Sequence, residues 1–264
     1  MGVTILQRLP TVLASLCLSA VLSGVSADSG CEIQAQGHVT PDPGVIASPN
    51  IHGLEQAWQR PDGVLMAPGQ ISGTGSINVG HVIIDGTLAP GNSPGCIDFG
   101  GNVTLSATAT LLTEIGGPTP CTEYDRISVA GQLSINAAKL QVVLLGYEPA
   151  LGERFDIMDW SSLSGSFGTV DTSAAILPPP LIWDTSQLYL SGELVVDMQH
   201  YADGDLAPWG SPDGQVNAAD VLIATQLALG LRVPGTLQFA HGDMNFDDAI
   251  DLADLLLIKQ IVLQ

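Results

Sequence analysis

The sequence predicts a mainly β protein that ends in a small helical domain. Two observations support this fold class. From about residue 70 to 198, short apolar or alternating runs are separated by turn signals such as Asp85-Gly86, and helix formers do not occur in series. After residue 199, an Asp-rich loop followed at once by an apolar helical run occurs twice, which indicates a duplicated loop–helix unit.

Residues 1–27 have the features of a secretory signal peptide. Arg8 supplies a short positive region, Thr11–Leu22 is apolar, and Val25-Ser26-Ala27 is a small-residue cleavage site. The apolar run is shorter than the roughly 20 residues that a membrane span needs. We therefore expect an exported protein, secreted or held at the cell surface, that is not inserted in a membrane once the signal is removed.

The next region, residues 28–69, is predicted to form an irregular N-terminal cap. Five prolines between Pro41 and Pro68 break any long element. The segment 56–59 is expected to form at most a short turn. Terminal segments of repetitive folds are often atypical because they cover an open core.

Ten short runs between residues 70 and 198 have the composition of β-strands. Strands of this number and spacing are typical of an all-β sandwich, barrel or solenoid. The length allows one domain with a full core. The predicted strands are Val82–Ile84, Val103–Ala107, Leu111–Ile115, Arg126–Val129, Leu133–Ile135, Leu140–Leu145, Phe155–Met158, Phe167–Val170, Leu188–Leu190 and Leu194–Val196.

The charge of the chain argues against two classes of partner. The 27 acidic residues against 7 basic ones give a formal net charge of −20. A surface this negative repels nucleic acid and anionic membranes, so neither is expected as a partner. It suits an exterior where salt screens the repulsion and divalent cations are abundant.

Three cysteines remain after the signal peptide: Cys31, Cys96 and Cys121. An oxidising compartment favours one disulfide among them. We predict the pair Cys96–Cys121, because both lie in Gly/Pro-rich turns that flank one pair of strands. No C-x-x-C spacing accompanies them, so neither a metal site nor a catalytic thiol is indicated.

The second Asp-rich loop, residues 243–254, has the spacing of a calcium-binding loop. Oxygen-bearing side chains occupy positions 1, 3, 5, 9 and 12, and the backbone carbonyl of position 7 completes the expected set. Ca²⁺ takes six to eight such oxygens, and five carboxylates within twelve residues would repel one another without a cation. The helix Leu255–Leu263 is expected to follow. The predicted ligands are Asp243, Asn245, Asp247, Ala249, Asp251 and Asp254.

The first copy lies 34 positions earlier and departs from the pattern near its start. Seven residues, rather than three, separate Asp205 at position 1 from Asp213 at position 5, so four extra residues are expected to bulge outward. Gly214 suits the sharp turn at position 6 better than Asp248 of the second loop does. Position 3 is filled by Ser211 or by a backbone carbonyl. The predicted ligands are Asp205, Ser211, Asp213, Gln215, Asn217 and Asp220.

Two calcium loops, each followed by one helix and lacking the entering helix of an EF-hand, resemble a type I dockerin domain over about residues 201–264. The resemblance implies calcium-dependent folding and docking onto a cohesin module of a scaffold or cell-surface protein. It also implies that loop positions 10 and 11 contact the partner; in this chain these are Ala218, Ala219, Leu252 and Ala253. The alternative is that the two helices pair through Leu222, Leu256 and neighbouring residues and bind nothing else.

Two phrases in the β-rich region resemble those of another family. The segments 86–95 (GTLAPGNSPG) and 124–131 (YDRISVAG) are similar to the closing portion of secreted autotransporter-passenger proteins with β-strand repeats. The resemblance implies a right-handed parallel β-helix, or solenoid, over residues 70–198, used as a surface stalk. A curled β-sandwich remains the alternative fold.

No catalytic constellation stands out, so the sequence favours a protein that is not an enzyme. A polysaccharide lyase pairs an Arg or Lys base with bound calcium. The basic residues between positions 28 and 198 look isolated in the sequence: Arg60, Arg126, Lys139 and Arg154. Asp156 and Asp159 are three residues apart in a strand-and-turn region and are expected to face different ways. Three functions remain open: a docked non-catalytic β protein, a carbohydrate-active or glycan-binding protein delivered to a scaffold for polysaccharide degradation, and a self-assembling surface protein.

Overall fold

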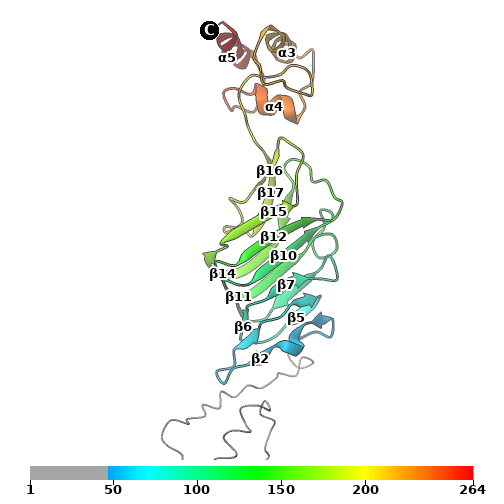
Figure 1. Cartoon of the computed structure of the whole chain (residues 1–264), viewed down its shortest axis with the longest axis vertical. Coiled ribbons are helices and arrows are strands. Elements are labelled where there is room, and N and C mark those ends of the chain that lie inside the picture. Colours follow the sequence, from blue (N-terminus) through cyan, green and yellow to red (C-terminus); the bar gives the residue numbers. More distant parts are fainter. Residues whose placement is uncertain (1–46, 264) are drawn as a thin grey trace, which may run out of the picture. The chain divides into compact units, whose positions relative to one another are not determined.

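The computed structural model describes residues 47–263, which form many short strands and, near the C-terminus, three α-helices (Figure 1). The predicted signal peptide (residues 1–27), Cys31 and the first part of the predicted cap (residues 28–46) lie outside the described residues. In the part that is described, no helix is long and apolar enough to cross a membrane. Below, residues 47–198 are called the β body and residues 199–263 the C-terminal segment.

Three sheets make up the β body. The first contains, in order, β1 (Ile51–His52), β4 (Ile71–Gly73), β7 (Thr87–Pro90), β10 (Thr110–Ile115), β12 (Lys139–Leu144) and β15 (Thr169–Ala174). The second contains β2 (Trp58–Gln59), β3 (Leu65–Ala67), β6 (His81–Ile84), β9 (Asn102–Leu105), β11 (Arg126–Asn136), β8 (Cys96–Phe99) and β5 (Gly75–Ile77), with β14 (Met158–Ser166) also paired to β11. The third contains β13 (Arg154–Asp156), β17 (Glu193–Met198) and β16 (Leu181–Asp184).

The pairing of the first two sheets is mostly parallel. The exceptions are the pairs β1–β4 and β2–β3 at the start, which are antiparallel. The chain passes repeatedly between the two sheets, and each new strand pairs with a strand of an earlier pass, as β12 does with β10 and β15 does with β12. Figure 1 shows β7, β10 and β12 side by side, as this order requires. The third sheet is antiparallel.

The core consists of apolar residues stacked in register from strand to strand. Because side chains alternate between the two faces of a strand, parallel pairing in register places every second residue of each strand in the same buried row. Each such residue contributes roughly 1.5–3 kcal/mol through burial. One row in the first sheet is Ile71, Leu88, Leu111 and Leu140, and one in the second is Leu65, Val82, Val103 and Leu133; none is more than 1% exposed.

Five of the predicted strands differ in the structure; one of them, Phe167–Val170, is displaced to Thr169–Ala174 (β15). The runs Arg126–Val129 and Leu133–Ile135 form one strand, β11, with an irregularity between Val129 and Gln132. The run Phe155–Met158 is divided, because the chain leaves the third sheet after Asp156 and enters the second at Met158. The predicted strand Leu188–Leu190 is wrong: it is a turn, in which the Leu188 N–H donates to the Thr185 carbonyl.

The described part of the predicted cap, residues 47–69, contains short regular elements. The segment 56–59, expected to form at most a short turn, contains the last residue of a 3-10 helix, η1 (Leu54–Gln56), and the strand β2. Strand β3 pairs in parallel with β6 and so extends the second sheet. Buried Leu54 and Leu65 join the same hydrophobic core as the later strands.

The C-terminal segment contains α3 (Ala218–Ala228), α4 (Thr236–Gly242) and α5 (Leu252–Val262). Helices α3 and α5 begin at matching caps: the side chain of Asn217 or Asp251 accepts an N–H of the first turn, and Asp220 or Asp254 bonds back to the cap N–H. Such reciprocal capping stabilises a helix start by about 1 kcal/mol. Local sequence therefore sets where both helices begin.

Helices α3 and α5 pack against each other, as the alternative interpretation expected, but not through Leu222 and Leu256. Leu222 is 59% exposed and Leu256 60% exposed. The helices meet instead through a small core that also includes the base of the first loop. Pairing through Leu222 and Leu256 is therefore wrong, because these residues lie on the outer faces. The buried residues of this core are Leu206, Ala207, Ile223, Ala224, Leu227, Leu255 and Ile258.

Candidate functional site

The second loop is organised around two carboxylates that are fully buried, Asp243 at position 1 and Asp254 at position 12. Asp243 accepts the N–H groups of Asp247 (3.2 Å) and Asp248 (3.0 Å). Asp254 accepts those of Met244 (2.8 Å) and Asp251 (2.9 Å). Each carboxylate therefore closes the loop from one end.

The first loop repeats this arrangement atom for atom. Asp205 accepts the N–H groups of Asp213 (3.3 Å) and Gly214 (2.6 Å). Asp220 accepts the N–H groups of Asn217 (2.7 Å) and Leu206 (2.7 Å). Asp205 and Asp220 are 4% and 0% exposed. The two loops are thus equivalent at positions 1, 5, 6, 9 and 12 in spite of the insertion.

The insertion in the first loop has a buried base and an exposed tip. At the base, Leu206 and Ala207 are buried, and both donate their N–H groups to Asp220 at 2.7 Å. The tip, residues 208–211, is exposed and is closed by a bond from the Ser211 N–H to the Pro208 carbonyl. The extra residues therefore extend the loop outward while its two ends stay together.

The remaining predicted ligands line the exposed side of the loops. Asp247 and Asp213, both at position 5, each accept the N–H two residues further on, which belongs to Ala249 and Gln215. Asn245 donates to Asp247 at 2.8 Å. The sharp turn at position 6 has φ 80° at Gly214 and 63° at Asp248, so Asp takes the left-handed conformation that Gly adopts freely.

The donor set suits a hard cation. In the part of the chain that the structure describes, no ion pair includes Asp205, Asp220, Asp243 or Asp254. Buried carboxylates normally pair with a cationic group or coordinate a metal, because burial of an unpaired charge is costly. Oxygen ligands of this kind are those that Ca²⁺ takes. Among residues 47–263, however, no three His, Cys, Asp or Glu side chains are grouped closely enough to hold a metal ion between them.

The residues expected to contact a partner begin the outer faces of the two helices. Ala218 and Ala219 start α3, Leu252 and Ala253 start α5, and all four are exposed. Residues at helical spacing continue each face. They are exposed leucines as well: Leu222 (59%) and Leu229 (61%) from α3, and Leu256 (60%) and Leu263 (84%) from α5.

Sequence reasoning missed two features of the C-terminal segment. Helix α4 ends just before Asp243, so the second loop does have a helix in front of it, contrary to the expectation. The available signal for that helix was Gly235, whose N–H donates to the side-chain oxygen of Gln238. The second feature is the contact of Arg232 with Trp209 from the tip of the insertion, 4.6 Å from the guanidinium carbon to the ring centre.

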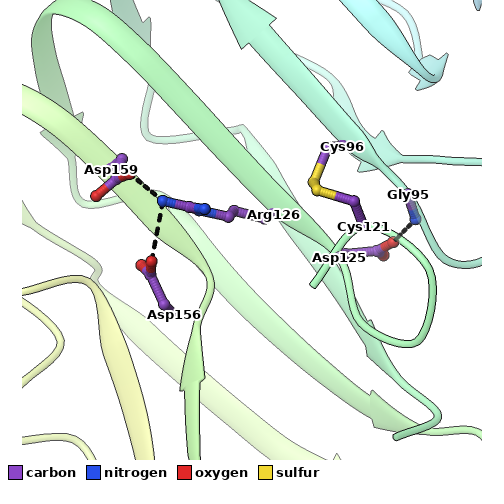
Figure 2. Close-up of a disulfide and its surroundings, with 7 residues drawn as sticks. All are labelled: Gly95, Cys96, Cys121, Asp125, Arg126, Asp156 and Asp159. Carbon is purple, nitrogen blue, oxygen red and sulfur yellow. Dashed lines mark hydrogen bonds and ion pairs between the residues drawn. A yellow bond between two sulfur atoms is a disulfide. The ribbon is translucent and has the colours of Figure 1, made fainter. Parts of the chain in front are cut away.

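In the β body, the structure joins Cys96 and Cys121, the predicted disulfide pair. The S–S distance is 1.97 Å and the Cα atoms are 4.8 Å apart. The bond connects the start of β8 with the loop between β10 and β11 (Figure 2). It therefore ties that loop to the second sheet.

Arg126 lies near the disulfide and holds two carboxylates (Figure 2). Its guanidinium contacts Asp159 and lies 3.0 Å from Asp156. The expectation that Asp156 and Asp159 face different ways is therefore wrong, because the chain changes sheets between them and both side chains point to Arg126. Burial raises the pKa of Asp156, an effect that Arg126 opposes.

The other three basic residues of the β body were also expected to be isolated, and this is wrong too. Each has an acidic partner, in two cases from a distant part of the chain. The pairs are Arg60–Asp62 (2.9 Å), Lys139–Asp171 (2.7 Å) and Arg154–Glu193 (2.9 Å). Partners that are far apart in sequence cannot be found from spacing.

Asp125 links the two phrases of the sequence that carry the second resemblance. Its carboxylate is 1% exposed and accepts the N–H groups of Gly95 (2.7 Å) and Glu114 (2.9 Å). Gly95 ends the first phrase and Asp125 is the second residue of the second phrase, so a single buried side chain holds the two together (Figure 2). Burial raises the pKa of Asp125 to about 7, although the two N–H donors lower it in part.

The stability of the β body should therefore depend on Asp125 and on pH. A carboxyl group whose pKa is higher in the folded than in the unfolded state contributes its full stabilisation of the fold below its unfolded pKa, near 4. This contribution is lost as the pH rises through the folded-state pKa of about 7. We expect the wild type to lose up to about 4 kcal/mol more than Asp125→Asn between pH 4 and pH 8. Urea denaturation of both proteins across this range measures the difference; parallel pH profiles would contradict it.

A comparison with known protein families finds a match in the C-terminal segment. Residues 212–263 match the family model of the dockerin type I domain. The match begins just before Asp213 and includes the whole second loop with α3, α4 and α5. Dockerin type I domains bind calcium, and they dock onto cohesins. A search of curated proteins finds no match to the chain.

Proposed function

We propose that this chain is an exported, non-catalytic protein whose β body is docked onto a cohesin-type partner through the calcium-binding C-terminal segment. The observation that carries the proposal is the apolar character of the exposed faces of α3 and α5. Leu222, Leu252 and Leu256 are each about 60% exposed although the domain has its own buried core. Exposed apolar patches of this kind mark interaction sites.

Calcium is the cation that we propose for the two loops. Asp205, Asp220, Asp243 and Asp254 would hold it from buried positions, together with the side chains and carbonyls at positions 3, 5, 7 and 9. Bound calcium would supply the positive charge that offsets these carboxylates. Through their N–H bonds, the same four side chains fix the ends of the loops and the starts of α3 and α5. Partner binding should therefore require calcium.

For the β body, we propose a right-handed parallel β-helix that serves as an extracellular or surface body. Parallel pairing between strands of successive passes supports this fold over a β-sandwich, whose sheets are antiparallel. The proposed domain limits are 28–69 for the N-terminal cap, 70–198 for the β-helix and 199–264 for the docking domain. A non-catalytic role is supported by Arg126, which engages both Asp156 and Asp159 and so leaves neither carboxylate unpaired.

Direct binding tests the docking function. The full mature chain is immobilised and probed with recombinant type I cohesin modules in millimolar calcium and again in chelator. We expect at least one module to bind in calcium and to dissociate in EDTA. If no module binds, or if binding is the same in chelator, a calcium-dependent docking function is excluded for this panel and the proposal is withdrawn.

A further inference from the structure

The two calcium loops differ in one feature that lies at the surface. Between positions 1 and 5, the first loop has Leu206–Pro212, whereas the second has only Met244, Asn245 and Phe246. Every hydrogen bond to Asp243 and Asp254 that closes the second loop has its counterpart in the first, which adds one bond from the Ala207 N–H to Asp220. The insertion is therefore not needed for the loop geometry, which leaves its exposed tip available for another role.

The tip presents a tryptophan with an arginine against it. Trp209 is 41% exposed, and the guanidinium carbon of Arg232 lies 4.6 Å from its ring centre. Together with Val233, which is 86% exposed, they line an open hollow of about 380 Å³. We call these three residues the Trp209 platform.

The platform is held in place from two sides. The base of the insertion is buried and bonded to Asp220, as described above. Arg232 follows the C-terminus of α3, where its N–H and that of Leu231 both donate to the Gln226 carbonyl. Both segments are thus anchored to α3, and little conformational entropy remains to be lost when a partner binds.

The platform extends the apolar outer face of α3. Leu222 and Leu229 lie on that face, and Leu231 (70% exposed) connects Leu229 to Arg232 along the chain. Tryptophan and arginine are the residues most enriched among those that dominate binding energy at protein interfaces. The position and composition of the platform therefore indicate a protein partner.

Arg232 also indicates the charge of that partner. No acidic side chain in residues 47–263 forms an ion pair with its guanidinium. Arg232 is one of two Lys or Arg residues in a C-terminal segment with nine aspartates. Stacking on an aromatic face leaves the in-plane N–H donors of an arginine free, and these match a carboxylate in a bidentate pair. A carboxylate of the partner is the group that fits this position.

We propose that the cohesin-type partner docks on the α3 side, with Trp209 and Arg232 as its anchor and a carboxylate opposite Arg232. This inference rests on the docking function proposed above. The duplicated residues of α3 and α5 present similar faces, so a partner that contacted only these residues would bind either one. The Trp209 platform adjoins α3 alone and makes the two faces unequal.

The test uses the full mature chain and whichever cohesin module binds the wild type in calcium. Trp209→Ala should weaken binding at least tenfold, whereas Phe246→Ala, which removes the exposed aromatic residue of the second loop, should change it less than twofold. Leu222→Glu should abolish binding and Leu256→Glu should leave it within about threefold. Arg232→Lys keeps the charge but not the planar donors. Its affinity for the module should lie between that of the wild type and that of Arg232→Glu.

Each outcome has one interpretation. Circular dichroism in calcium establishes that every variant folds; Trp209 lies at an exposed tip, so its replacement should not unfold the domain. Equal losses from Leu222→Glu and Leu256→Glu, or wild-type affinity for Trp209→Ala, would overturn the inference and leave docking intact. A wild-type chain that binds no module removes the docking function and, with it, this inference.

Discussion

Asp254→Ala is expected to abolish the calcium-dependent helical signal of the C-terminal segment. The substitution removes a buried carboxylate that we propose as a calcium ligand, and it leaves the N–H groups of Met244 and Asp251 without their acceptor. Each unsatisfied group costs about 1–3 kcal/mol. The combined loss of about 2–6 kcal/mol is comparable to the entire stability of a domain of this size. Asp243→Ala should have the same effect, since Asp243 is equally buried and accepts two N–H groups.

Calcium titration followed by far-ultraviolet circular dichroism measures this effect, and calorimetry gives the number of ions bound. The matched control is Asp248→Asn, which removes one charge from the same loop. Asp248 is exposed, and asparagine tolerates its positive φ of 63°. The control should titrate like the wild type. An Asp254→Ala chain that still gained helix on calcium addition would show that the second loop is mis-assigned.

Removal of the Cys96–Cys121 disulfide is expected to produce the second large effect, this time in the β body. The bond closes a loop across a sequence separation of 25 residues. Loop-closure entropy for a loop of this size corresponds to roughly 3 kcal/mol. The double variant Cys96→Ser/Cys121→Ser should therefore unfold at a lower temperature and a lower urea concentration than the wild type.

The control for the disulfide is Cys31→Ser, which should leave stability unchanged. Reductant should destabilise the wild type to the level of the double variant and have no effect on that variant. Mass mapping of a non-reduced digest identifies the bridge independently. A peptide that linked Cys31 to either of the other cysteines would contradict the pairing.

Local sequence was sufficient for features that depend on a few neighbouring residues. The residues of the second loop lie within twelve positions of one another and those of the first within sixteen, and Asn217 and Asp251 cap the helices that follow them directly. Five strands of the β body, β6, β9, β10, β12 and β17, were also predicted within two residues, because alternating apolar residues determine which face is buried. Strands β4, β5, β7, β8, β14 and β16 were not predicted. Helix α4 was missed, since seven residues with a Gly cap give a weak periodic signal.

Long-range partners could not be predicted in the same way. Arg126 appeared isolated because the acids that it contacts follow 30 and 33 positions later, as the difference in residue number shows. The role of Asp125 could not be predicted, because Gly95 and Glu114, whose N–H groups it accepts, come beside it only in the fold. Leu188 has the composition of a strand residue, but the chain turns there and buries it completely.

By itself, the sequence determined the two acidic loops, the helices after them and the β character of the body, because each arises from contacts between close neighbours in the chain. Only the tertiary structure decided which sides of α3 and α5 are buried, which acids meet Arg126, and that Trp209 lies against Arg232. These features depend on how distant segments pack. Packing depends on the shape of the whole core and cannot be deduced from the spacing of residues along the chain.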